Sequence, residues 1–299
     1  YSENERDLAA RVDEALKRME SHRERTGIAY EPLMVWPQER YSVQALRAVS
    51  ASRAFLGVVN ARCIPDDPTA AGQVRAADLL LPAQDSWFGI PILKRYCEAQ
   101  GIANFALALF LGRPAILAEH HEYFRAGTDR MERFAAEIRR ISPKARWAPL
   151  SETLTRLCWQ RRISKNHWGV RFFADRFDLV HDMGETVQYE LTTRVSENAV
   201  VERVTVNGTP VSFLVNGRTL QFRLRVSSRG LLRIAVAIRR AEHPISRSTT
   251  LGYRAYVGVR RALCEVRDNV VSRSVTAARV VRGLGLGLLS HAFSEQWLL

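Results

Sequence analysis

Residues 113–124, RPAILAEHHEYF, place a short apolar run directly before a cluster of ionisable residues. The apolar run extends from Ala115 to Ala118. The ionisable residues that follow it are Glu119, His120, His121 and Glu122. An apolar run without polar alternation is typical of a strand buried on both faces, as in parallel sheets. We therefore expect a buried strand here, whose carboxyl end delivers ionisable side chains to a pocket.

The segments around this strand alternate between apolar runs and helical patterns. Further strands are expected at 32–37, 54–60 and 77–82. Helices are expected at 3–25, 42–52, 103–112, 128–142 and 151–162, with Ser42 capping the second and Thr128 or Asp129 the fourth. Short apolar strands separated by helices predict a parallel α/β sheet covered on both faces, over residues 28–160.

An all-β pattern begins near residue 162. Segments 185–195, 200–206, 219–226 and 231–238 show partial alternation of apolar and polar residues. Asn207-Gly208 and Asn216-Gly217 are typical of tight hairpin turns. These features predict a small β-sandwich domain over residues 162–242, after an α/β domain over 1–161. The aromatic residues Trp168, Phe172, Phe173 and Phe177 fit its core, or alternatively a platform on which a glycan stacks.

A helical tail is expected over residues 243–299. Its apolar seam is formed by Tyr256, Val259, Leu263, Val266 and Val270, at spacings of three and four. This seam predicts a helix that packs on its own domain; the alternatives are association with a partner helix or with an anionic membrane surface. No stretch approaches the ~18 apolar residues of a transmembrane span.

The amino-terminal sequence leaves the cellular location of the protein open. The chain begins YSENERDL, without an initiator Met and already inside an expected helix, which indicates a fragment or a processed product. A signal segment could have preceded it, so both a cytoplasmic and a periplasmic location stay open.

The net charge of +13 raises the question of nucleic-acid binding. Only four of the 44 basic residues are lysines, so 44 − 4 leaves 40 arginines, spread along the chain rather than gathered in one block. A skew of this kind is typical of a GC-rich coding sequence. We therefore keep nucleic-acid binding only as a minor alternative.

The sequence offers no evident metal site. Its four cysteines, Cys63, Cys97, Cys158 and Cys264, lie far apart and are expected to be dispersed, half-buried thiols. Paired histidines with metal-ligand spacing, phosphate-binding glycine loops and a GxSxG nucleophile motif are all missing from the sequence.

Three expected strand ends carry polar clusters, at residues 36–42, 60–67 and 119–124. If the strands are parallel, the three clusters lie at one edge of the sheet, where α/β folds bind their ligands. His120 and His121 are the candidate acid/base residues, with Glu119 or Glu122 to orient the one that faces the pocket. Asp66, Asp67 and Asp85 are candidate carboxylate partners, or else ordinary loop and capping residues.

The order of MVWPQERYS, FLGVVN and PAILAEHH resembles the later part of polysaccharide deacetylases, a family of (β/α) barrels. The resemblance covers about residues 28–125 and implies a partial barrel. It also implies that Pro37 and Tyr41 line a substrate groove and that His120 is the general acid on the leaving amine. The full candidate set is His120, His121 and Glu119 for catalysis and Pro37, Glu39, Arg40, Tyr41, Asp85 and Trp87 for substrate binding.

The chain also departs from this family. The Thr-Phe-Asp-Asp-Gly motif, which supplies the base and a metal-binding Asp, is missing, as is the His-x-x-x-His pair; the motif at Trp36 lacks its arginine and glycine. Either these parts lay upstream of Tyr1, together with ligands for a divalent metal such as zinc, or the lineage keeps the scaffold without the hydrolysis. In both cases we expect no metal-dependent deacetylation by this chain.

Two main hypotheses of function follow. The first is a carbohydrate-active module, the later half of a deacetylase-like protein acting on a polysaccharide or oligosaccharide. The second is a non-catalytic polysaccharide-binding or assembly protein on the same scaffold. An Arg-rich nucleic-acid-binding protein is the third, and a steep salt dependence of its binding would distinguish it.

Overall fold

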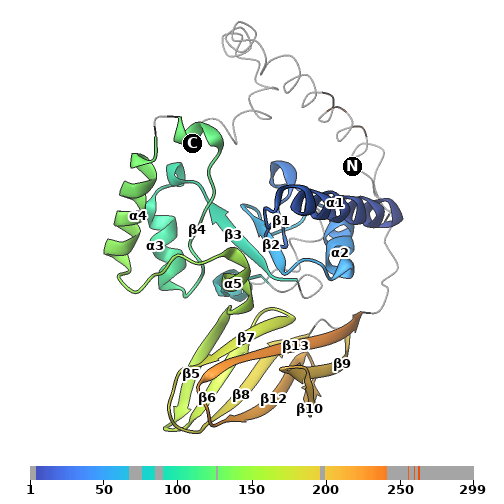
Figure 1. Ribbon diagram of the computed structural model, residues 1–299, viewed down its shortest axis with the longest axis vertical. Helices are drawn as coiled ribbons and strands as arrows, with labels where there is room; N and C mark the ends of the chain where they lie inside the picture. The colour runs from blue at the N-terminus through green and yellow to red at the C-terminus, as the bar shows by residue number, and fades with distance from the viewer. Residues whose placement is uncertain are drawn as a thin grey trace, which may run out of the picture. The chain divides into compact units, whose positions relative to one another are not determined.

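A computed structural model gives the fold of the chain (Figure 1). It describes residues 5–66, 76–84, 90–125, 127–195 and 199–240, together with Ala255, Val259 and Ala262. Residues 2–241 pack as one compact unit, which holds both the α/β part and the β-sandwich, and residues 242–299 belong to a second unit.

The α/β part is built on four parallel strands. These are β1 (Leu33–Met34), β2 (Gly57–Asn60), β3 (Ile92–Tyr96) and β4 (Ile116–Leu117), paired in the order β1-β2-β3-β4. The predicted parallel sheet is thereby confirmed. The spatial order of these strands is the same as their order in the sequence, as it also is in (β/α) barrels. The four strands described here nevertheless form an open sheet that does not close.

The helices largely match the expected pattern. They are α1 (Glu5–Thr26), α2 (Val43–Ser52), α3 (Ile102–Phe110), α4 (Asp129–Ile141) and α5 (Leu150–Thr155), with short 3-10 helices η1 (Pro37–Glu39), η3 (Ala76–Leu80), η4 (Glu98–Gln100) and η5 (His121–Phe124). Ser42 caps α2 as predicted, because its hydroxyl accepts a hydrogen bond of 3.1 Å from the Ala45 amide.

The two faces of the sheet are covered differently. Ile92 packs in one cluster with Val12 of α1 and Leu46 of α2, and Tyr96 packs with α3 and α4. Since Ile92 and Tyr96 share one face of β3, both helix pairs cover that face. Leu93 points the other way, into a cluster with Leu154 and Leu157 around α5 and with Phe173.

Two expectations about individual elements were wrong, and one strand was not predicted. The predicted strand at 77–82 lies in and just after η3 instead, where its leucines lack the β-branching that favours strands. Strand β3 was not predicted, since Lys94 and Arg95 interrupt its apolar run. The predicted helix over 151–162 ends at Thr155, because Cys158–Ser164 pairs with the following strand instead.

The β-sandwich consists of two sheets over one core. Its strands are β5 (Cys158–Ser164), β6 (His167–Phe172), β7 (Arg176–His181), β8 (Val187–Arg194), β9 (Ala199–Val206), β10 (Thr209–Val211), β11 (Leu214–Asn216), β12 (Thr219–Val226) and β13 (Gly230–Arg240). They form the sheets β10-β9-β13-β7 and β11-β12-β8-β6-β5. Pairing is antiparallel apart from β6 with β8.

The four strands predicted in this region are confirmed, and so is the turn at Asn207-Gly208. The second hairpin turn forms at Gly217-Arg218, one residue later than predicted, because Asn216 still pairs with Thr219 at the end of β11. Asn207 and Gly208 have φ values of 51° and 84°, the left-handed pair that a two-residue hairpin turn requires. The inward alternation of the strands buries Phe172, Phe177 and Leu191. Phe172, Phe173 and Phe177 are thus core residues and not a stacking platform, while Trp168 is half-buried.

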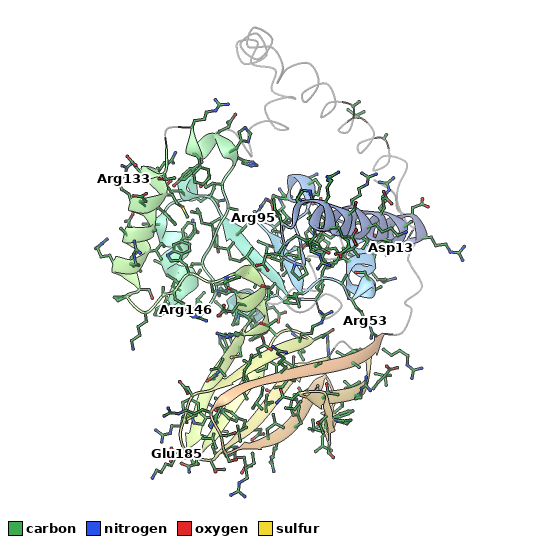
Figure 2. The ribbon with its side chains drawn as sticks, viewed as in Figure 1. Asp13, Arg53, Arg95, Arg133, Arg146 and Glu185 are labelled. Atoms are coloured by element: carbon green, nitrogen blue, oxygen red, sulfur yellow. The ribbon has the colours of Figure 1, made fainter. Side chains whose placement is uncertain are left out.

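Specific contacts join the sandwich to the α/β part. Arg53, which ends α2, donates to the Ile238 carbonyl at 2.6 Å and accepts from Arg176 at its own carbonyl (Figure 2). Arg194 on β8 forms an ion pair of 3.1 Å with Asp78 of η3. These contacts, with the cluster around Leu154, tie the two parts together.

The predicted tail helix lies outside the described residues, except that Ala255, Val259 and Ala262 are helical. Within the described residues, no helix has the combination of length and apolar character needed to traverse a bilayer.

Candidate functional site

Glu39 lies where the first two predicted clusters meet. Its carboxylate accepts hydrogen bonds from the backbone amide of Ala61, after β2, and from the guanidinium of Arg95 on β3. Glu39 adopts a left-handed φ of 60°, which strains a residue with a side chain. The contacts with Ala61 and Arg95 hold it there, so Glu39 ties the ends of three neighbouring strands together.

Asn60 completes this junction from the end of β2. It is fully buried, and its amide nitrogen donates to the carbonyls of Glu39 at 3.0 Å and Arg62 at 2.9 Å. These bonds fix the path of the loop that follows β2. The predicted convergence of the clusters at 36–42 and 60–67 is therefore confirmed for their described residues.

Arg40 and Tyr41 also take part in packing this edge. Arg40 lies 3.6 Å from the Asp66 carboxylate. Tyr41 is buried against Trp36, with stacked rings 5.4 Å apart, and its hydroxyl donates to the Arg62 carbonyl. Burial raises the Tyr41 pKa far above its ordinary value, so its hydroxyl stays protonated.

The third cluster follows β4 and meets the residues after β3. Glu119 accepts a hydrogen bond of 2.6 Å from the Glu98 amide, and the Glu98 carboxylate pairs with Arg130. His120 and His121 are exposed at the start of η5. Neither histidine lines the cavity described below. Pro37 is exposed at the start of η1, and Asp85 and Trp87 lie outside the described residues.

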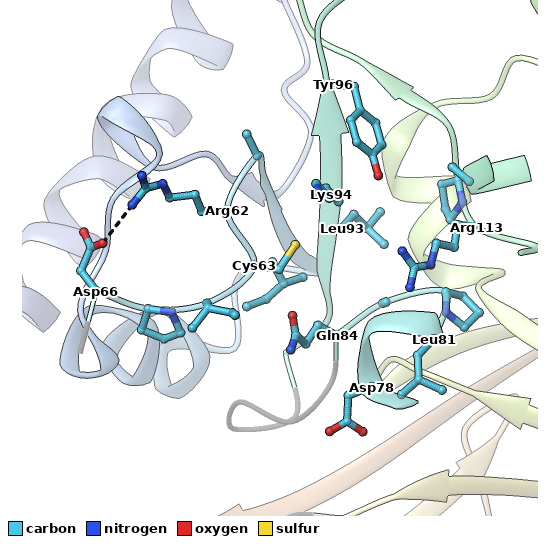
Figure 3. Close-up of a pocket in the computed structure, with 18 residues that line it drawn as sticks. Arg62, Cys63, Asp66, Asp78, Leu81, Gln84, Leu93, Lys94, Tyr96 and Arg113 are labelled. Atoms are coloured by element: carbon cyan, nitrogen blue, oxygen red, sulfur yellow. Dashed lines mark ion pairs between the residues drawn. The ribbon is translucent and has the colours of Figure 1, made fainter. Parts of the chain in front are cut away.

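A cavity of about 520 Å³ opens beside β3 (Figure 3). Its charged and polar lining residues are Arg62, Cys63, Asp66, Asp78, Gln84, Lys94, Tyr96 and Arg113, and its apolar lining includes Ile64, Leu81, Ile92 and Leu93. The volume falls within the roughly 300–1,000 Å³ of small-molecule sites. The mixed lining suits a ligand with both polar and apolar surface.

The position of the cavity follows from the connections between strands. Helix α2 links β1 to β2, and α3 lies between β3 and β4. In the described residues between β2 and β3 there is only η3. Gln84 is held against β3, since its backbone exchanges hydrogen bonds of 3.0 and 2.9 Å with Ile92. Space thus remains between the two helix pairs, next to the side chains of Lys94 and Tyr96.

Sequence patterns gave little sign of this cavity. Lys94 and Tyr96 belong to the strand that was not predicted, and Arg113 precedes the apolar run 115–118 without any pattern that marks it as a site residue. The alternation in ILKRY, followed by a polar turn, was the available signal. Cys63, Cys97 and Cys158 are half-buried free thiols, as expected.

Burial raises the pKa of Cys63 to about 11, although the nearby charges of Lys94 and Arg113 lower it. The thiolate is the reactive form. We therefore predict that iodoacetamide modifies Cys63 slowly at neutral pH and about tenfold faster for each added pH unit up to about 11. Peptide mass spectrometry of briefly treated folded protein measures this rate, and a plateau below pH 9 would contradict the prediction.

No three His, Cys, Asp or Glu side chains among the described residues are placed to hold a metal ion together. Comparison of the chain with models of known families, with curated proteins and with solved structures finds no match.

Proposed function

We propose that this chain binds an oligosaccharide in the cavity beside β3 without cleaving it. The observation that carries the proposal is the cavity itself, about 520 Å³ in volume and lined by hydrogen-bonding and apolar side chains together. Sugars present both kinds of surface, hydroxyl groups at the ring edge and C–H groups on its faces. The resemblance of residues 28–125 to polysaccharide deacetylases supports the same ligand class.

Binding without hydrolysis is favoured by where the candidate catalytic residues lie. His120 and His121 are exposed and are not part of the cavity wall. Glu119 is engaged by the Glu98 amide. The sequence also lacks the family motif that supplies a base. The role of His120 as a general acid stays a prediction of the resemblance.

Filling the cavity tests the proposal. We predict that Ala61→Trp, in the cavity wall, weakens binding of neutral and acidic tetrasaccharides at least tenfold. The matched control is Ala103→Trp, on the exposed side of α3, which should bind like the parent protein. Isothermal titration calorimetry against a panel of tetrasaccharides measures both. Failure of the parent protein to bind any saccharide, or equal binding by Ala61→Trp, overturns the proposal.

Hydrolysis is tested separately. We predict that the chain releases no acetate from acetylated chito-oligosaccharides, with or without added zinc, because it lacks the Thr-Phe-Asp-Asp-Gly motif that holds the base and a metal ligand. An enzymatic acetate assay measures this. Zinc-dependent acetate release that is lost in His120→Ala would instead support the deacetylase hypothesis.

A further inference from the structure

Two cations at the cavity, Lys94 and Arg113, have no acidic partner among the residues that the structure describes. The Nε atom of Arg113 is buried and has no hydrogen-bond partner in the described ranges of the chain. The Lys94 ammonium lies over the Tyr96 ring, 5.1 Å from its centre. A buried guanidinium nitrogen without an acceptor is unfavourable unless a ligand supplies one.

The acidic residues of the cavity are already neutralised. Asp66 lies 3.5 Å from Arg62 and 3.6 Å from Arg40. Asp78 is paired with Arg194 at 3.1 Å. Cys63, also in the cavity wall, carries no charge at neutral pH because its pKa is about 11. Lys94 and Arg113, in the cavity wall, therefore form no ion pair with a carboxylate of the described residues.

Gln84 adds a third donor. The residue is only 5 % exposed, and its amide nitrogen meets no hydrogen-bond partner among the described residues. Figure 3 shows Gln84 and Arg113 on different walls of the cavity. Their backbones are fixed, because Gln84 bridges to Ile92 and the Arg113 amide donates to the Ala108 carbonyl at 2.8 Å. The backbone at both donors is thus fixed before a ligand arrives, which leaves fewer degrees of freedom to be lost on binding.

From this arrangement we infer that the cavity selects acidic saccharides, with the carboxylate or phosphate group of the sugar held by Arg113, Lys94 and the Gln84 amide nitrogen. An anionic oxygen is the acceptor that all three donors lack. The guanidinium of Arg113 offers a planar pair of donors that matches a carboxylate or phosphate, and Lys94 adds a point charge. This inference rests on the proposed function, because the anion is part of a saccharide.

Calorimetry with four probes tests the inference: tetragalacturonate, glucose 6-phosphate, inorganic phosphate and neutral maltotetraose. We expect one of the two acidic sugars to bind at least tenfold more tightly than maltotetraose, and its affinity to fall between 20 and 500 mM NaCl. Tighter binding of tetragalacturonate identifies a uronate site, and tighter binding of glucose 6-phosphate a sugar-phosphate site.

Charge-removing variants test the assigned residues. Arg113→Met and Lys94→Met should each weaken binding of the preferred acidic sugar at least tenfold, and by a larger factor than they weaken binding of maltotetraose. Arg113→Lys should recover part of the loss. The control Arg125→Met removes an equal charge from an exposed pair with Glu122 and should change neither affinity. Lys94 is exposed, so Lys94→Met keeps the test valid if an Arg113 variant unfolds.

The outcomes separate the two proposals. If maltotetraose and acidic sugars bind equally and the Lys94 and Arg113 variants change nothing, the acidic specificity is wrong and oligosaccharide binding stands. If no saccharide binds, the proposed function fails and the acidic specificity fails with it. Binding of inorganic phosphate alone would show an anion site and overturn the assignment to saccharides.

Discussion

Leu154→Ala should lower the free energy of unfolding by about 3–5 kcal/mol, as truncation of fully buried leucines does. Leu154 is 0 % exposed and belongs to the cluster that joins α5 to Leu93 of β3 and to Phe173 of the sandwich. The truncated side chain leaves a cavity at the junction of the two parts, where the rigid sheet on one side limits collapse. Urea denaturation followed by circular dichroism measures the change.

The close packing of Gly57 against Leu154 allows a second, more specific test of this contact. A Cβ atom added to Gly57 would lie 2.8 and 2.9 Å from the two Leu154 methyl groups and 3.0 Å from the Pro91 carbonyl oxygen. Gly57→Ala should therefore destabilise the parent protein by about 1–3 kcal/mol through overpacking. In the Leu154→Ala background the new methyl group fills vacated space and only the contact with the Pro91 carbonyl remains, so the same change should be less harmful.

A double-mutant cycle distinguishes this contact from general damage. We expect a coupling free energy of about 1 kcal/mol or more, with the double variant more stable than the sum of the single changes predicts. The control Leu107→Ala truncates a leucine that is 56 % exposed on α3 and should change stability far less. Additive effects of the two substitutions would contradict the packing described here.

The fold was predictable where apolar pattern and local turn chemistry agree. The apolar run before Glu119 became a strand of the parallel sheet, and the Asn207-Gly208 turn formed between β9 and β10. Strand β3 was not predicted because two charged residues, Lys94 and Arg95, lie at its centre. Lys94 lines the cavity and Arg95 binds Glu39 at the edge of the sheet, so neither packs in the core. A strand with two adjacent charged residues at its centre loses the apolar pattern by which strands are recognised.

The candidate site was predictable only in part. Sequence order places the polar clusters after β1 and β2 at one edge, and Glu39 and Asn60 do meet there. The cavity depends instead on residues distant in sequence, such as Gln84 and Arg113, which the pairing of strands brings to one place. The spacing of these residues in the sequence does not predict that they lie close together, because their proximity arises from tertiary packing.

Glu39→Ala should lower the free energy of unfolding by roughly 2–4 kcal/mol, since it removes a charged acceptor from partly buried donors. The carboxylate serves both the Ala61 amide and the Arg95 guanidinium, whose side chain is 24 % exposed. Without it, Arg95 loses its counter-charge and the loop after β2 loses an anchor. We expect this variant to weaken saccharide binding as well, because that loop forms one wall of the cavity.

Comparison of three variants separates charge, hydrogen bonding and backbone strain at Glu39. Glu39→Gln keeps an acceptor but loses the charge, so it should be less destabilising than Glu39→Ala. Glu39→Gly should also be less destabilising than Glu39→Ala, by about 1 kcal/mol, because glycine adopts a φ of 60° without strain. The matched control Glu122→Ala breaks an exposed pair with Arg125 and should cost no more than about 0.5 kcal/mol. Thermal denaturation ranks all four; a Glu39→Ala variant as stable as Glu122→Ala would mean that the edge of the sheet holds its shape without this carboxylate.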